Sequence, residues 1–207
     1  MRFLVALTLA LALARPADAG FVLRAADVTA PPGGTGTLLV TLTNDGPTDL
    51  ALSGYQIQLT TDVAGFRFTG VDRTPGYVFP GTTGPLSSDF APPLLVSPVT
   101  RFTATDFSAN PLGYDTVGAG QTVSLMAVSY AVDPGAAPGT GFIRFVSPGA
   151  GAADLTHLAD GSGNLAAFAA VDGRVTITPA PPGLVLVLTA GAALGLCRRA
   201  RHRPTAG

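Results

Sequence analysis

Short segments in which apolar and polar side chains alternate recur through the middle of this chain, separated by turns rich in glycine and proline. The clearest is Tyr55–Thr60, in which Tyr55, Ile57 and Leu59 would face inward and the glutamines outward. Alternation with a period of two is typical of β-strands that are buried on one face. The chain has no lysine and no glutamate, two strong helix formers. The pattern therefore predicts an all-β domain.

Eight strands are expected from this alternation. They are Phe21–Arg24, Leu38–Thr43, Tyr55–Thr60, Phe66–Thr69, Arg101–Phe107, Val123–Val132, Phe142–Val146 and Arg174–Thr178. Irregular chain is expected at about 72–99, and a loop at Pro134–Gly141. The aromatic residues Phe66, Phe68, Tyr130 and Phe145 are expected in the core. Short strands at this spacing predict a β-sandwich or jelly roll.

The order of these segments resembles that of a cohesin-like domain, within the wider group of carbohydrate-binding-type β-sandwiches. The resemblance rests on the turn Pro31–Gly34, the third-strand segment Leu52–Ile57, the turn Ala137–Thr140 and the closing Asp172–Val175. It covers most of 21–178 and implies a single cohesin-like sandwich. Cohesins bind dockerin modules in cellulosomes, so the resemblance is compatible with a protein-binding module.

The N-terminal residues have the pattern of a secretory signal peptide. A short basic start is followed by the apolar run Phe3–Ala14, and Ala17 and Ala19 form a small-x-small cleavage site before Gly20. The apolar run is too short for a transmembrane helix. We expect 1–19 to be removed during passage through the Sec export machinery.

The C-terminal residues 179–207 have three parts. Pro179, Ala180 and Pro181 form a short motif, the uncharged segment 184–197 follows, and a basic cluster closes the chain. The cluster in 198–203 contains Arg198, Arg199, Arg201 and Arg203. As a helix, 184–197 would span about 21 Å, short of the roughly 30 Å hydrocarbon core. The arginines predict a cytoplasmic C-terminus.

This tail resembles the PEP-CTERM sorting signal of Gram-negative bacteria. Pro179 and Pro181 match the two prolines of its motif, and Ala180 stands where the signal usually has glutamate. The resemblance implies brief anchoring in the inner membrane, removal of the tail by an exosortase-type protease, and a final place at the cell surface or outside the cell. The alternative is an ordinary C-terminal membrane anchor.

Charge and cysteine content restrict the function of the domain 20–178. It contains twelve aspartates and six arginines, a net charge of −6. Nucleic-acid binding requires a basic face that neutralises phosphates, so we expect none. The only cysteine is Cys197 in the tail, so the domain has no disulfide. Cys197 is either an acylation site or an inert apolar residue.

No catalytic motif is evident. His157 is the only histidine in the domain, and no Gly-x-Ser-x-Gly elbow accompanies it. We expect it in a loop or on the surface. The aspartates form no glycosidase motif, and no glutamate is available as the acid. The sequence therefore predicts a protein that is not an enzyme, with a secreted hydrolase as the open alternative.

A few residues are candidates for ligand binding. Asp160 and Asn164, in a segment of oxygen ligands and glycines, suit either calcium or a plain turn. Tyr77 and Tyr114 lie in expected loops, where they would either stack on a sugar or pack locally. No cofactor is expected. The sequence thus predicts an exported surface or extracellular-matrix protein; the alternative is a carbohydrate-binding or protein-adhesion module, whose ligand would be an extracellular polysaccharide or a protein.

Overall fold

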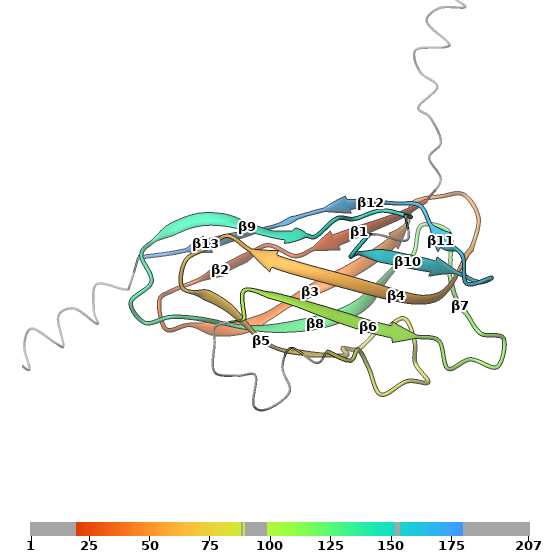
Figure 1. Cartoon of the computed structure of the whole chain (residues 1–207), viewed down its shortest axis with the longest axis horizontal. Helices are drawn as coiled ribbons and strands as arrows, with labels where there is room; N and C mark the ends of the chain where they lie inside the picture. Colours follow the sequence, from red (N-terminus) through yellow and green to blue (C-terminus); the bar gives the residue numbers. More distant parts are fainter. Residues whose placement is uncertain (1–19, 88, 90–98, 152–153, 180–207) are drawn as a thin grey trace, which may run out of the picture.

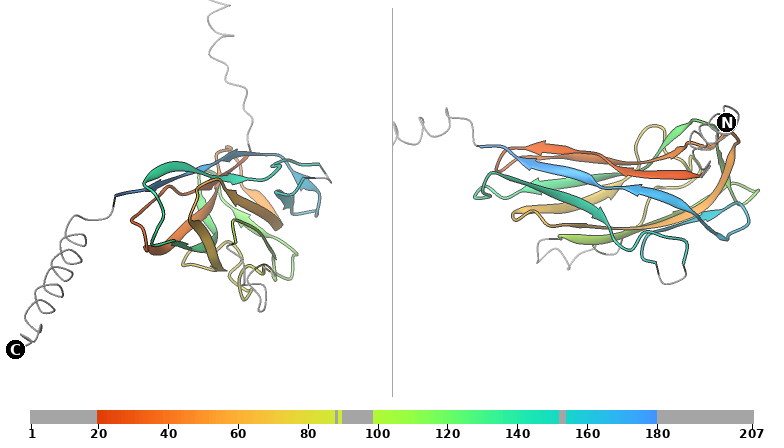
Figure 2. Two further views of the ribbon diagram at one scale, coloured as in Figure 1. Left: turned by 60° about the vertical axis from the view of Figure 1, so that its left-hand side comes forward. Right: turned by 90° about the horizontal axis from the view of Figure 1, so that it is seen from above.

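The computed structural model describes residues 20–87, 89, 99–151 and 154–179. These residues form two β-sheets packed face to face, with strands along the long axis of the molecule (Figures 1 and 2). The described residues contain thirteen strands and no α-helix, which confirms the all-β prediction. The expected signal-peptide helix in 1–19 and the hydrophobic helix 184–197 lie outside the described residues.

The smaller sheet has five strands in the order β12-β1-β3-β8-β5. Its members are β1 (Phe21–Ala25), β3 (Thr35–Asn44), β5 (Phe66–Asp72), β8 (Thr122–Val132) and β12 (Phe168–Val171). Strand β1 pairs antiparallel with β3 and parallel with β12. The strand that begins the domain therefore lies inside a sheet and pairs on both edges.

The larger sheet has eight strands arranged around β4. Its members are β2 (Val28–Ala30), β4 (Leu50–Thr61), β6 (Arg101–Phe107), β7 (Asp115–Val117), β9 (Gly139–Phe145), β10 (His157–Asp160), β11 (Leu165–Ala166) and β13 (Gly173–Ile177). One edge of β4 pairs with β6 and β7. The other edge pairs with β9 near its end and with β10 near its start.

Strands β9 and β10 pair antiparallel with the same edge of β4 and are separated by a loop. The chain leaves the edge of β4 after Val146, whose amide donates to the Gln58 carbonyl at 2.9 Å, and rejoins it at Thr156. The Thr156 hydroxyl accepts from the Gln58 amide at 3.1 Å and donates to the Gln58 carbonyl at 3.2 Å. The buried Thr156 side chain thus provides the hydrogen-bond acceptor for the Gln58 amide where the backbone pairing is interrupted.

The core lies between the inner faces of the two sheets. Tyr55, Ile57 and Leu59 are buried, which confirms the predicted facing of β4. The four aromatic residues expected in the core are buried as well: Phe66, Phe68, Tyr130 and Phe145. The rings of Phe66 and Tyr130 stack with centroids 5.0 Å apart, a geometry that adds to the stabilisation from burial alone.

Several boundaries differ from those expected. Strand β9 begins at Gly139, inside the predicted loop Pro134–Gly141, because Gly139 and Thr140 pair with β13. His157 begins a strand and does not lie in a loop. Five short strands, β2, β7, β10, β11 and β12, were not predicted, because two to four residues are too few to show a period. The described part of 72–99 beyond β5 has only isolated bridges, as expected.

Candidate functional site

The outer face of the larger sheet, over β10, β4 and β6, carries the most distinctive surface of the described residues. In the strand register Gln56 lies between Thr105 of β6 and His157 of β10. One pair further along, Gly54 lies between Phe107 and Ala159. We call this surface, with Gln58, Arg101, Thr103 and Leu86, the β10-β4-β6 face.

Polar side chains on this face hold one another in place. The Arg101 Nε donates to the Gln58 Oε1 at 2.9 Å, and the Gln58 Nε2 donates to the Thr103 hydroxyl at 2.7 Å. The Gln56 side-chain Nε2 donates to the Leu155 carbonyl at 3.3 Å. Side chains that are already ordered lose less conformational entropy when a partner binds. The centre of the face is therefore organised before any contact is made.

Two large apolar side chains stand exposed at one end of the face. Phe107 is 68% exposed and Leu86 is 64% exposed. Leu86 pairs with Thr105 across an antiparallel bridge, so its side chain shares the outward direction of Thr105 and Phe107. Gly54 lies opposite Phe107 and has no side chain to cover the ring. We call Leu86 and Phe107 the apolar pair; two large apolar side chains exposed on the same face of a sheet make this face a candidate interaction surface.

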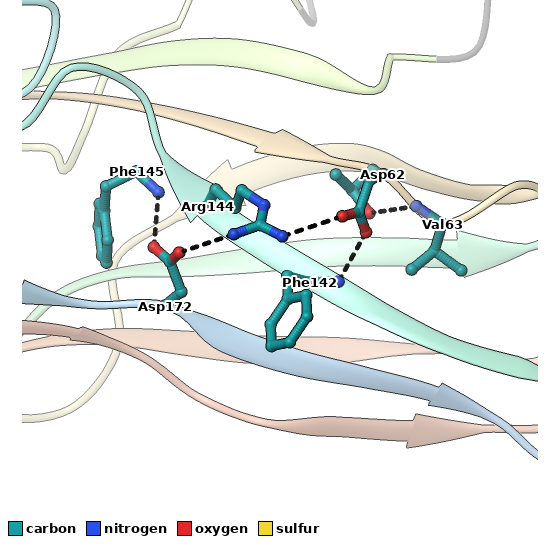
Figure 3. Close-up of polar contacts among 7 residues, drawn as sticks. Asp62, Val63, Phe142, Arg144, Phe145 and Asp172 are labelled. Atoms are coloured by element: carbon teal, nitrogen blue, oxygen red, sulfur yellow. Dashed lines mark hydrogen bonds and ion pairs between the residues drawn. The ribbon is translucent and has the colours of Figure 1, made fainter.

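The other end of the sheet is charged and closely paired (Figure 3). Arg144 extends between Asp62 and Asp172, with nitrogen–oxygen distances of 3.3 and 3.6 Å, and its guanidinium lies 4.6 Å from the centroid of the Phe142 ring. Asp62 also accepts from the Phe142 amide at 2.7 Å, and Asp172 from the Phe145 amide at 3.1 Å. This Arg144 cluster joins the end of β4, β9 and the start of β13.

The Arg144 cluster has an electrostatic signature. The hydrogen bond from the Phe142 amide, with the neighbouring Arg144 guanidinium, holds the pKa of Asp62 below its usual range. The side chains of Asp62 and Arg144 are each about half exposed. The cluster therefore links three strands at the surface, and its two carboxylates share one guanidinium.

Tyr77, an expected ligand contact, belongs to a hydrogen-bonded cluster around Asp106, on the inner side of β6 in the larger sheet. Its hydroxyl donates to the buried Asp106 carboxylate, which also accepts from the Thr82 hydroxyl at 2.8 Å. The Tyr55 hydroxyl lies 2.9 Å from that of Tyr77 and donates to the Leu125 carbonyl at 2.6 Å. Burial raises the pKa of both phenols, so both stay protonated. The Tyr77 hydroxyl is thus held by protein groups, and stacking of its ring on a sugar stays a prediction.

Tyr114 and Asp160, two further expected ligand contacts, lie together. They line an open cleft of about 550 Å³ with Ser162 and Gly20. The Asp160 Oδ1 accepts from the amides of Ser162 and Asn164 at 2.8 and 2.9 Å, which is the geometry of a turn. Calcium binding by Asp160 and Asn164 stays a prediction; no group of three or more potential metal-ligating side chains occurs among the described residues.

The remaining expected site residues divide between the two ends of the chain. Pro179 is the last described residue. Those outside the described residues are Ala17, Ala19, Ala180, Pro181, Arg198, Arg199, Arg201 and Arg203. Within the described ranges, no helix has the length and hydropathy needed to cross a bilayer. The His157 Nδ1 lies 3.1 Å from the Asp154 carbonyl oxygen.

Sequence reasoning singled out neither residue of the apolar pair, although the alternation in β6 held a signal for Phe107. Arg101, Thr103 and Thr105 alternate with the inward Phe102 and Ala104. Continuing that alternation places Phe107 on the polar, outward face and Asp106 on the inward face. An aromatic residue on a polar face, and an aspartate on an apolar one, are both departures from the pattern.

The fold is that of a cohesin-like β-sandwich. Among solved structures, similarity extends to a chain of a type I cohesin–dockerin complex from Clostridium thermocellum, with a TM-score of 0.57 and 16% identity over 77% of this chain and 99% of that one. The seventh ScaB type I cohesin from Pseudobacteroides cellulosolvens matches with a TM-score of 0.56 and 12% identity over 79% and 95%. The non-cellulosomal cohesin from the archaeon Archaeoglobus fulgidus matches with 0.52 and 14% over 77% and 92%.

These likenesses are of fold alone. No protein-family profile and no curated protein sequence matches the chain. Because the identities lie at 16% or below, they establish the sandwich and its topology but carry over no binding residue.

Proposed function

We propose that this protein is an exported, non-enzymatic adhesion module that binds a protein partner through the β10-β4-β6 face. The observation that carries the proposal is the apolar pair, Leu86 and Phe107, exposed beside an ordered polar surface. The cohesin-like fold supports it, because a structural neighbour forms a cohesin–dockerin complex. A protein partner is favoured over a small molecule because this surface is the outer face of a sheet.

The chemistry of the face fits a protein interface. Exposed aromatic residues are typical energetic centres of protein interfaces, especially when polar groups around them exclude water. Phe107 would supply that centre, with Leu86 beside it and the hydrogen-bonded Gln58 and Thr103 further along β4 and β6. The partner would present an apolar side chain to Phe107 and hydrogen-bonding groups to Gln58 and Thr103.

The binding proposal can be tested with charged variants of the full chain. Immobilised Phe107→Asp is compared with Leu39→Asp, a matched change at an exposed leucine (41%) of β3 in the other sheet. Extracellular proteins from the native cells are passed over each and identified by mass spectrometry. We expect a partner that wild type and Leu39→Asp retain and Phe107→Asp loses by at least about tenfold, as expected for an interface centre. Equal retention by all three would contradict the proposal.

Delivery forms the second half of the proposal. The signal peptide 1–19 would direct export, and 179–207 would hold the protein briefly in the inner membrane until an exosortase-type protease cuts near Pro179–Pro181. The test is the intact mass of the exported protein in native cells with and without exosortase activity. A C-terminus near 178–182 only when the protease is present is the expected result. A full-length C-terminus in both strains would show that 184–197 is a plain anchor.

A second candidate function is carbohydrate binding in the Tyr114 cleft. The specific observation is that the Tyr114 ring, the Asp160 carboxylate and the Ser162 hydroxyl line one cavity. An aromatic ring beside hydroxyl and carboxylate groups suits a sugar residue. Affinity electrophoresis in the native extracellular polysaccharide would show retardation that Tyr114→Ala removes and Leu39→Ala, at an exposed leucine of the other sheet, keeps. Identical mobility of wild type and Tyr114→Ala would rule this function out.

A further inference from the structure

Gly20, at the start of the described domain, forms two hydrogen bonds with Asp45. The Gly20 nitrogen lies 3.3 Å from the Asp45 Oδ1 and donates to it, and the Asp45 amide donates to the Gly20 carbonyl at 3.3 Å. Asp45 follows the end of β3, and in the next residue pair Phe21 lies opposite Asn44. The antiparallel pairing of β1 with β3 therefore continues to Gly20.

The sequence places the expected signal-peptide cut at this same residue. Hydrolysis of the Ala19–Gly20 bond consumes one water and leaves a carboxylate on Ala19 and a free α-amino group, protonated near neutral pH, on Gly20. We propose that Gly20 is the mature N-terminus, and that its α-ammonium forms an ion pair with Asp45 that exists only after processing. The inference rests on the export half of the proposed function and assigns its cleavage site.

The surroundings favour an ammonium at this position. Two cavities include Gly20 in their lining, and their ionisable side chains are Asp45, Asp160 and Tyr114. Two of these are acids and none is a base, so no described lining side chain repels a positive charge. Before cleavage the Gly20 nitrogen is a neutral amide donor; after it, the same contact becomes charge-assisted, which strengthens a hydrogen bond. Processing would therefore stabilise β1, which pairs on both edges.

The pH dependence of the pair has a definite sign. A free α-amino group titrates at about 7.7–8.0, and a carboxylate partner raises that pKa in the folded protein. The ion pair therefore contributes its full stabilisation below about pH 7 and loses it as the pH rises through the raised value. An uncut chain has no such group and shows no such dependence at this site.

The first part of the test locates the cut. The full chain is exported from native cells, and the N-terminus of the product is sequenced. Gly20 as the first residue is the expected result, and any other first residue overturns the assignment. Protein that leaves the cell with a different N-terminus would leave export intact, whereas protein retained inside with 1–19 attached would contradict export as well.

The second part measures the ion pair without depending on export. In the full chain, the residues before Gly20 are replaced by the recognition site of a protease that cuts directly before glycine. Unfolding by urea is then followed before and after cutting, both for the chain that keeps Asp45 and for its Asp45→Asn variant. Asp72→Asn, at a carboxylate whose contact is the neighbouring Arg73 amide, is the matched control.

We expect Asp45→Asn to lower the folding equilibrium constant about two- to fivefold more in cut than in uncut protein at pH 6.5, the range of an exposed ion pair. That difference should disappear at pH 10, and Asp72→Asn should show none at either pH. An equal effect of Asp45→Asn before and after cutting, or a difference that persists at pH 10, would overturn the ion pair.

Discussion

Asp106 places a carboxylate in a buried site, and no ion pair to it occurs among the described residues. It accepts hydrogen bonds from the Tyr77 and Thr82 hydroxyls and from the Phe107 amide, the last two at 2.8 and 2.9 Å. Neutral donors therefore replace the water that burial removes. This arrangement fixes the segment around Tyr77 and Thr82 against β6, directly beneath the apolar pair.

Removing one donor tests this role. Tyr77→Phe leaves the Asp106 carboxylate with one hydrogen bond fewer in a buried site, and we expect a loss of about 1–3 kcal/mol in the free energy of unfolding. Urea denaturation followed by tyrosine fluorescence measures it. The control is Tyr114→Phe, whose hydroxyl makes no hydrogen bond to the described residues and whose loss should cost less than about 0.5 kcal/mol. A cost for Tyr77→Phe as small as that of the control would contradict the account.

Asp62 gives a prediction for acid stability. Its pKa lies below the usual range because the Phe142 amide and the Arg144 guanidinium stabilise the carboxylate in the folded state. A group with a lowered folded pKa stabilises the protein above its unfolded pKa, and that contribution is lost as the pH falls through the folded value. Between about pH 4.5 and 2.5 we expect wild type to lose stability more steeply than Asp62→Asn. If the urea midpoints of wild type and Asp62→Asn fell in parallel with pH, protonation of Asp62 would not be linked to unfolding.

At the scale of elements, the sequence predicted the long strands well and the short ones poorly. Strand β6 has the predicted bounds, Arg101–Phe107, because its apolar and polar residues alternate throughout. Strands β7 and β11 have three and two residues, and their pairing is set by the register of β4 and β10. Local sequence patterns carry no information on such tertiary contacts, so strands of this length cannot be predicted from periodicity.

The interruption between β9 and β10 depends on one hydroxyl. Thr156→Val keeps the shape of the side chain but removes both contacts to the Gln58 backbone. We expect a loss of about 1–3 kcal/mol in the free energy of unfolding, because the half-buried Gln58 amide loses its acceptor while the Gln58 carbonyl keeps only the Val146 amide. Hydrogen exchange at the Gln58 amide should accelerate as well. Thr37→Val, at an exposed threonine of β3, should change neither quantity; equal behaviour of the two variants would rule out this role for Thr156.

At the scale of the whole molecule, the proposed delivery and the proposed binding depend on different parts of the chain. The sequence patterns at 1–19 and 179–207 predict transport, and the β10-β4-β6 face belongs to the larger sheet, in which β10 and β6 lie on either side of β4 (Figure 1). The alternation of apolar and polar residues predicted an all-β domain, and the fold matches. It could not predict which sheet face is the candidate binding surface, because that depends on the bridge between Leu86 and Thr105, which lies two residues before Phe107.

The most direct test of the central claim is photo-cross-linking in intact native cells. A photoreactive phenylalanine analogue is placed at Phe107 in the full chain and, for comparison, at Leu39 on the opposite sheet. We expect a discrete protein adduct from position 107 and none from position 39, because only the β10-β4-β6 face would contact a partner. Adducts from neither position, or the same adducts from both, would contradict the assignment of this face as a protein-binding surface.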